Sequence, residues 1–487
     1  MKKFFAIFLT FVMVFSLVSC QTEQEGPFPE GSELPETEPD EYIRLTEGVS
    51  KEMLSADFWT SRVESEEVLM TEKEISAFNE RNKKQIAWAD VTYSLKEFPE
   101  RVSGDIVREY VATAMPEDPS AYYVNGQPAT EEYFETIDEN RALDQIPDVV
   151  DVRYGYAVRR AELRTYPTND FGVTDPENFF YDELIYGQCF PYCPLVVLHE
   201  SLDGNWYYVF FDGFGSWVTA DAVALCRSRA DWLRRQEEDC FLLVTGREIR
   251  LPHDEGCPGV SELLLPMGTK LPLVPFENTP ETVRMRIGYG CYTVLLPTRA
   301  EDGYIKDEYA FVSTAEDVSV GFLPYSPQNV VRLAFKFLGD RYGWAGGDLS
   351  NDCSGMIRQI YDCFGFTLPR TDSMQIKCKG LKTFDLTDLP DEEKRQTIAS
   401  LPMGSLLQFP GHIMLYIGTV DGVNYVINSV GSFATMEMET GDYQYVNTCC
   451  INSLEQTRRG NGDTWLTNMT FAGYPAPEEK TEQENEV

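Results

Sequence analysis

Basic residues and histidines are scarce in this chain of 487 residues. Lys and Arg together number 41 against 79 Asp and Glu, so the formal net charge is -38, and only three histidines occur. Nucleic acids and anionic lipid surfaces are bound by clustered Lys and Arg. The charge balance therefore argues against nucleic acid and against a peripheral hold on acidic lipid, and indicates mainly solubility.

Paired metal-ligand motifs are absent as well. The histidines, His199, His253 and His412, are far apart in sequence, and no pair of Cys-x-x-Cys elements occurs. Structural zinc sites need four such ligands at close spacing. We therefore expect neither zinc nor any other cofactor.

Only one long apolar run occurs, from Phe4 to Val18, directly after Lys2 and Lys3. It is too short for a transmembrane helix but suits an export signal. The "LVSC" that ends at Cys20 resembles the lipobox of bacterial lipoproteins, in which the cysteine is lipidated. We expect residues 1–20 to be a lipoprotein signal peptide, so that the protein is exported and lipid-anchored to a bacterial membrane. The alternative is an ordinary secretory signal.

Two acidic segments flank the folded part. Residues 21–48 contain nine Asp or Glu and four prolines, which predicts a solvated tether, and 476–487 reads as an acidic tail. Outside the cytoplasm disulfides are permitted. Eleven cysteines remain after Cys20, so at least one is unpaired; Cys189–Cys193 and Cys449–Cys450 are possible pairs, and the connectivity stays open.

The pattern of apolar and turn-forming residues divides the remainder of the chain into four parts. Residues 49–148 predict helices, with Thr71 and Glu74 at capping-box spacing. Residues 149–226 and 227–322 contain short β-rich runs separated by turn residues, which predicts two small antiparallel barrels. Residues 323–475 predict two helices followed by antiparallel strands, an α+β arrangement.

Cys353 begins the second of these helices, after Asp352. Free N–H groups and the positive end of the helix dipole predict a lowered thiol pKa there. A thiolate needs a base, and His412 is the only histidine after His253. Singly, the cysteine could be inert packing and the histidine structural; together they indicate nucleophilic catalysis.

Asn428 is the candidate that would orient His412. A two-residue turn at Asp421–Gly422 places the two side chains on opposite faces of the hairpin, which would exclude Asn428. A three-residue turn that includes Val420 places Asn428 opposite Met414, on the face of His412. The three-residue turn is our prediction. The simpler alternative is that Asn428 satisfies strand-end backbone groups.

Three motifs, "YGWAGGDLSNDCSG", "FGFTLPRTDSMQ" and "GHIMLYIG", together resemble the NlpC/P60 family of papain-like cysteine peptidases over about 323–475. The upstream parts are similar to the N-terminal stabilising domain (49–148) and the two bacterial SH3-type domains (149–226 and 227–322) of multidomain members. The resemblance implies a papain-like catalytic domain with helices packed on an antiparallel sheet.

The resemblance also implies a function. It is hydrolysis of amide bonds in peptidoglycan stem peptides or muropeptides, typically between γ-D-glutamate and the diamino acid, by a monomer. Cys353 would be the nucleophile, His412 the base and Asn428 the orienting residue, and Tyr342 would stabilise the oxyanion with the Cys353 N–H. The residues implied for the substrate groove are Asp352, Ser354 and Arg370.

Two departures from the family pattern stand out. Relatives usually read Trp-Gly-Gly where this chain has Trp344, Ala345 and two glycines, so the loop is expected to bend differently. The first SH3-type domain often supplies an acidic residue for a free substrate amine, whereas this chain offers Gln188 in "LIYGQ". Trp217 is then expected to form an apolar wall of the groove.

Two other functions remain open at the level of sequence. One is a lipoprotein that binds wall peptides through its SH3-type domains and carries an idle peptidase domain. The other keeps papain-like chemistry but transfers the acyl group, as an amidase or acyltransferase.

Overall fold

The computed structural model describes most of the chain from Tyr42 onward, as one compact unit that begins at Leu45. The described residues are 42–478 without 64–65, 83–86, 89–90, 93–94, 114, 212, 238–239, 436–437, 440 and 458–462. The predicted signal peptide, its Cys20 and most of the tether and tail lie outside them. No helix in the described part is long and apolar enough to cross a membrane.

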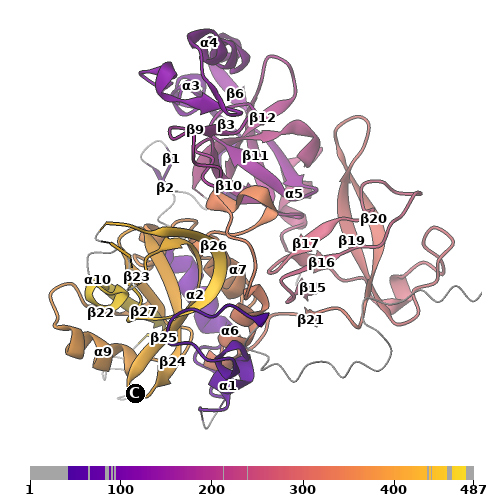
Figure 1. Cartoon of the computed structure of the whole chain (residues 1–487). Helices are drawn as coiled ribbons and strands as arrows, with labels where there is room; N and C mark the ends of the chain where they lie inside the picture. Colours follow the sequence, from indigo (N-terminus) through magenta and orange to yellow (C-terminus); the bar gives the residue numbers. More distant parts are fainter. Residues whose placement is uncertain are drawn as a thin grey trace, which may run out of the picture. The chain divides into compact units, whose positions relative to one another are not determined.

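A six-stranded antiparallel sheet forms the centre of the C-terminal part, in the order β22-β27-β23-β24-β25-β26 (Figure 1). Its strands are β22 (Leu381–Asp385), β23 (Leu406–Phe409), β24 (His412–Val420), β25 (Val423–Phe433), β26 (Gln444–Ser453) and β27 (Phe471–Pro475). The helices of this part are α6 (Pro327–Ala334), α7 (Cys353–Asp362), α8 (Asp372–Gln375), α9 (Asp391–Ala399) and α10 (Trp465–Asn468). The mixture of helices and antiparallel strands predicted for 323–475 is confirmed.

Alternation along β24 explains how helices cover both faces of this sheet. Ile413 and Leu415 pack in one core with residues of α6 and α7, while Met414 and Tyr416 pack in another with residues of α9 and α10. A strand with apolar residues at every position is expected when both of its faces are buried. The first of these cores fixes α7, and hence its first residue Cys353, against the sheet.

The hairpin between β24 and β25 differs from the prediction. Val420 pairs with Val423, so the turn is the two-residue Asp421–Gly422, with both φ angles positive (50° and 80°), as type I′ turns require. The register then shifts between Tyr416 and Gly418, and Leu415 pairs with Ile427. The bulge at this point adds one residue to β24, which restores the register that the three-residue turn was meant to supply. The inference that a two-residue turn excludes Asn428 is therefore wrong.

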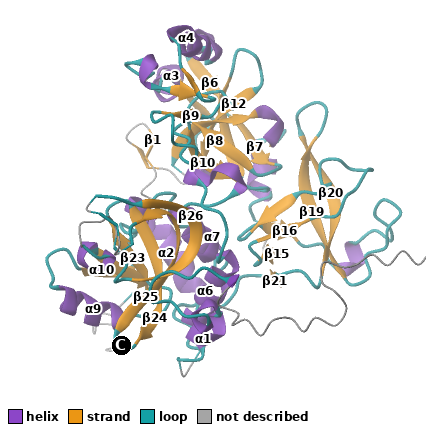
Figure 2. Ribbon diagram, viewed as in Figure 1, coloured by secondary structure: helices purple, strands orange, loops and turns teal. Residues whose placement is uncertain are grey.

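The middle of the chain is rich in antiparallel strands (Figure 2). A seven-stranded sheet, in the order β10-β8-β13-β12-β11-β7-β14, contains β7 (Arg153–Ala157), β8 (Ala161–Arg164), β10 (Ile185–Cys189), β11 (Pro194–Glu200), β12 (Trp206–Phe211), β13 (Phe214–Thr219) and β14 (Val223–Leu225). The helix α5 (Arg229–Arg234) follows, and then smaller sheets contain β15 (Phe241–Val244), β16 (Glu248–Arg250), β17 (Leu264–Pro266), β18 (Lys270–Pro272), β19 (Cys291–Arg299), β20 (Ile305–Ser313) and β21 (Val318–Val320). The antiparallel strands agree with the prediction; their assignment to SH3-type domains stays a prediction.

The segment from 49 to 148 packs in two different places. Its elements are α1 (Ala56–Thr60), α2 (Glu72–Asn82), α3 (Gly104–Val111), α4 (Glu131–Asn140), and the short strands β1 (Ala87–Trp88), β2 (Val91–Thr92), β3 (Arg101–Ser103), β4 (Tyr123–Val124) and β5 (Gln127–Pro128). Two strands beyond the segment pair with it, β6 (Val149–Asp151) with β3 and β9 (Gly172–Val173) with β4. Trp59 and Phe78 belong to the core of α6 and α7, whereas Phe98 and Val107 belong to that of the seven-stranded sheet.

The predicted capping box at the start of α2 is confirmed. The Thr71 N–H donates to Glu74 Oε2 at 2.8 Å, and the Glu74 N–H donates to Thr71 Oγ1 at 3.4 Å. Further along α2, the side chain of Asn79 donates to the Gly365 carbonyl and accepts from the Thr367 N–H. These bonds join the helix to the chain just beyond the end of α7.

Trp59 generates the first prediction. It is wholly buried, donates from its indole nitrogen to the Met53 carbonyl, and contacts the ring of Tyr425 in β25. Trp59→Ala is expected to lower the free energy of unfolding by about 3–5 kcal/mol, since it leaves a large cavity. Urea unfolding measures the change. Val68→Ala, at an exposed position of the same segment, is the control, and its free energy of unfolding should stay within about 0.5 kcal/mol of the wild type. Equal effects of the two substitutions would contradict the placement of Trp59 in the core.

Candidate active site

Cys353 is the first residue of α7, and Asp352 caps that helix. The Asp352 side chain accepts a hydrogen bond from the Gly355 N–H at 2.7 Å. The first N–H groups of a helix have no partner within the helix, so the Cys353 N–H is available to an oxygen placed beside its sulfur. The thiol itself lies at β24, because the backbone N–H of Ile413 is a hydrogen-bond donor to it.

The electrostatics of the thiol differ from the prediction. Burial, and after it the carboxylate of Asp352, raises the pKa of Cys353 to about 12, against the smaller lowering effect of the Ile413 N–H. The expected lowering by the helix N-terminus is overturned because the side chain is only 9% exposed. A thiol that is protonated at neutral pH depends on a base at the moment of attack.

His412 and Asn428 lie in direct contact. His412 Nε2 is 2.8 Å from Asn428 Oδ1, and both side chains are buried. Asn428 Nδ2 donates to the Cys450 carbonyl at 3.3 Å and to Asn452 Oδ1 at 3.0 Å, which identifies Oδ1 as the atom facing the imidazole. The proton of a neutral His412 is then on Nε2, and Nδ1 is the basic nitrogen.

The surroundings of His412 fix the plane of its ring. The Pro410–Gly411 turn before it has a positive φ at Gly411 (89°), as a type II turn requires. Phe409 and Trp465 contact the imidazole with ring centroids 5.6 and 5.7 Å away. Sequence inspection missed Trp465, since it comes from α10, 53 residues further along the chain.

The three residues expected in the substrate groove bind one another. Arg370 Nη2 and Nη1 donate to the two Asp352 carboxylate oxygens at 2.5 and 3.1 Å, and Nη1 also donates to Ser354 Oγ. All three side chains are buried. The Arg370 guanidinium is thus paired with a carboxylate of the chain itself, that of Asp352, and the cluster orients the start of α7.

Two tyrosines approach the thiol. The nearby Cys353 sulfur contributes, after burial, to raising the pKa of Tyr342, so the Tyr342 hydroxyl stays protonated and can donate. Tyr181, which the sequence analysis did not single out, has its pKa raised to about 12 by burial, with Cys353 among the smaller causes. Its ring contacts those of Tyr342 and Trp344 with centroids 6.0 and 5.3 Å away. The segment before β10 therefore borders the site.

Trp217, which was expected to form an apolar wall of the groove, does not line it. Trp217 is wholly buried in the core of the seven-stranded sheet, against Tyr208 and His199. That prediction is wrong, because the β13 pleat turns its indole inward. Gln188 is also buried and bonds to Arg160 and to the loop before Cys353.

The loop from Trp344 to Leu349 bends sharply. That it bends differently from the loop of relatives stays a prediction. Ala345, Asp348 and Leu349 all have positive φ (51°, 56° and 55°). Residues other than glycine rarely adopt this region and lose about 1 kcal/mol or more there. The loop must therefore be stabilised by its surroundings.

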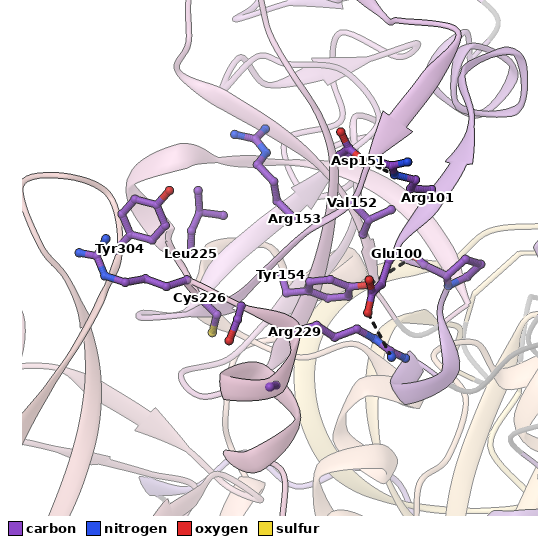
Figure 3. Close-up of a pocket in the computed structure, with 14 residues that line it drawn as sticks. Glu100, Arg101, Asp151, Val152, Arg153, Tyr154, Leu225, Cys226, Arg229 and Tyr304 are labelled. Atoms are coloured by element: carbon purple, nitrogen blue, oxygen red, sulfur yellow. Dashed lines mark hydrogen bonds and ion pairs between the residues drawn. The ribbon is translucent and has the colours of Figure 1, made fainter.

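The described residues also form a cavity away from Cys353 and His412. This cavity of about 880 Å³ is lined by residues 99–101, 151–154, 225–230 and Tyr304, which include neither Cys353 nor His412 (Figure 3). Ion pairs Arg101–Asp151 and Arg229–Glu100 cross its wall. Within the described part, no three His, Cys, Asp or Glu are grouped to hold a metal ion, and the eleven cysteines there carry free thiols.

The Cys353 thiol at the helix N-terminus bonds the N–H of Ile413, which follows His412, and His412 is hydrogen-bonded to Asn428. A cysteine, a histidine and an asparagine are the set used by papain-like cysteine hydrolases. In agreement, residues 339–453 match the model of the NlpC/P60 family. The C-terminal part of the chain therefore contains an NlpC/P60 domain, which is the family expected from its motifs.

Individual relatives extend the likeness beyond that domain. Dipeptidyl-peptidase 6 of Lysinibacillus sphaericus is 23% identical over 246 residues, which are 49% of this chain and 76% of that protein. The structure of an NlpC/P60 endopeptidase from Photobacterium damselae subsp. piscicida superimposes with a TM-score of 0.66 at 18% identity, over 87% of this chain and 97% of that one. An NlpC/P60 family protein of Bacillus cereus ATCC 10987 gives 0.46 at 18% identity, over 66% and 100%. The first of these structures shows that the fold is shared over most of the chain.

The raised thiol pKa predicts how Cys353 reacts in the resting enzyme. Only the thiolate is nucleophilic, so alkylation by iodoacetamide should accelerate steadily as the pH rises from about 6 to about 10. Peptide mass mapping separates Cys353 from the other thiols. The exposed Cys240 is the internal control. A rate that is already at its plateau near neutral pH would contradict a protonated resting thiol.

Proposed function

We propose that this chain is a cysteine peptidase that cleaves amide bonds of peptidoglycan stem peptides, between γ-D-glutamate and the diamino acid. The observation that carries the proposal is the contact of His412 Nε2 with Asn428 Oδ1. His412 begins β24, the strand whose Ile413 N–H bonds the Cys353 thiol. The NlpC/P60 domain supports the reaction class. The bond and the substrate rest on the motif resemblance.

Proton transfer is the first step of the mechanism. His412 Nδ1 accepts the proton of the Cys353 thiol as Sγ attacks the amide carbonyl carbon, and the imidazolium keeps its Nε2–H on Asn428 Oδ1. The charge on the imidazolium is stabilised by that oxygen dipole and not by a carboxylate. The base is therefore regenerated easily in the next step.

The tetrahedral intermediate places negative charge on the former carbonyl oxygen. The Cys353 N–H, at the positive end of α7, and the protonated hydroxyl of Tyr342 are the donors available for it. His412 then gives its proton to the leaving amine, and a thioester remains. Water, deprotonated by the same nitrogen, hydrolyses the thioester and releases the acid and the free thiol.

The proposal also includes a cellular location for the enzyme. The charged, apolar and small-residue pattern that ends at Cys20 supports export and lipid anchoring to a bacterial membrane, with 21–48 as a tether. Wall peptides or muropeptides outside the cytoplasm would then be within reach.

Incubation with L-Ala-γ-D-Glu-diamino acid peptides tests the function. Wild-type protein is expected to release the diamino acid, identified by mass, and Cys353→Ala is expected to lose turnover entirely, because no other group attacks the carbonyl. Equal turnover by both proteins would end the peptidase proposal. Binding without turnover by either would favour a wall-binding lipoprotein, and turnover that needs an added amine acceptor would favour an acyltransferase.

Asn428→Ala tests the orienting role. Loss of the acceptor for Nε2–H allows the other tautomer and other ring positions, so kcat should fall at least about tenfold, a part of the 10²–10⁴ that a positioned base contributes. Asn424→Ala is the matched control, since Asn424 is a wholly buried asparagine in the same strand that bonds Thr419 and Arg395. If both variants lose the same activity, packing and not orientation explains the effect.

A further inference from the structure

We propose that two buried residues, Gln188 of β10 and Arg160 directly before β8 of the seven-stranded sheet, are positioning residues for Cys353. They act through the loop of residues 349–351, which leads directly into the helix that carries the nucleophile. The inference rests on the proposed function only where its test measures peptide turnover. It makes the activity of the NlpC/P60 domain dependent on a sheet more than 150 residues earlier in the chain.

The side chain of Arg160 binds backbone carbonyl groups of the loop. Its Nη1 donates to the Leu349 carbonyl and its Nη2 to the Ser350 carbonyl, both at 2.5 Å. A planar guanidinium presents these two donors in a fixed geometry, so the two carbonyl oxygens are held side by side. Leu349 is one of the residues with positive φ. Arg160 thus stabilises the conformation that is costly for the loop alone.

Gln188 completes the contact. Its Oε1 accepts from Arg160 Nε at 2.7 Å, so its Nε2 faces the loop and donates to Asn351 Oδ1 at 3.0 Å and to the Ser350 carbonyl at 3.3 Å. Gly346 makes room for it: a Cβ at Gly346 would lie 2.6 Å from Gln188 Cδ. The amide is required here because a carboxylate would have no proton to donate to these oxygens.

The loop is also hydrogen-bonded to the elements that carry the proposed catalytic residues. The Asn351 carbonyl accepts from Ser429 Oγ at 2.9 Å, and Ser429 follows Asn428 in β25. Asn351 Oδ1 also accepts from Gln359 Nε2 of α7 at 2.7 Å. Residue 351 therefore bonds the sheet with Gln188, the strand of Asn428 and the helix of Cys353.

The hydrogen bonds of the Arg160 side chain all go to the oxygens named above, and its guanidinium also lies 5.6 Å from the ring centroid of Phe190. The side chain is 7% exposed, and no ion pair to it occurs among the described residues. Burial lowers its pKa to about 10, so it stays protonated at neutral pH. Burial of a cation costs free energy on folding, and here the three hydrogen bonds to these oxygens offset that cost.

Arg160→Met and Arg160→Lys test the proposal in the full chain. Met removes all three donors, so kcat for the peptide should fall about 10–100-fold, as expected for a misplaced reacting group, while KM changes less than about threefold. Lys keeps the charge and one donor group and should recover part of the loss. Arg159→Met is the matched control, since Arg159 pairs with Asp221 on a more exposed surface, and it should behave as wild type.

A second readout does not need the peptide. The rate at which iodoacetamide modifies Cys353 should change severalfold in Arg160→Met and not in Arg159→Met, even if the wild type hydrolyses none of the peptides offered. Folded Arg160→Met with wild-type kcat and alkylation rate would overturn the proposal. Should Arg160→Met fail to fold, Gln188→Glu decides: a lowered kcat or altered alkylation rate supports the positioning role, and wild-type values of both overturn it.

Discussion

The hydrogen bond between His412 and Asn428 depends on a single extra residue in β24. The tight Asp421–Gly422 turn alone would direct the two side chains to opposite faces, and the bulge before Gly418 brings them to the same face. Trp59 packs at that point, so close that a Cβ at Gly418 would lie 2.9 Å from its ring. The N-terminal segment thereby supports the register on which the orientation of the base depends.

The nucleophile is constrained in the same manner from its other side. Its thiol is buried and protonated, its neighbouring carboxylate is neutralised by Arg370, and the loop before it is bound by Arg160 and Gln188. Such a site is prepared by packing and backbone contacts rather than by a ready-made thiolate. Under the proposed function, catalysis would then depend on the geometry of proton transfer to His412 and on the hydrogen-bond donors available to the oxyanion.

Sequence reasoning found the parts of this site whose signals are local. The start of α7 at Cys353, the capping box of α2 and the strand that begins at His412 follow from spacing and turn residues. It failed where contacts are distant: the bulge leaves no mark on the hairpin pattern, and the inward side of Trp217 depends on the pleat of its sheet. The Asp352–Arg370 pair and the contact of Gln188 with Asn351 join residues 18 and 163 positions apart, which no periodicity reveals.

The contacts of Arg160 with carbonyl oxygens have a consequence for how such proteins diverge. Every residue type carries the same carbonyl, so the contact of Arg160 by itself makes no demand on the side chains at positions 349 and 350. A search for compensating changes between charged positions would therefore miss this contact between the two parts of the chain. The side chains on which the contact itself depends are the arginine, the amide beside it and the glycine that gives that amide room.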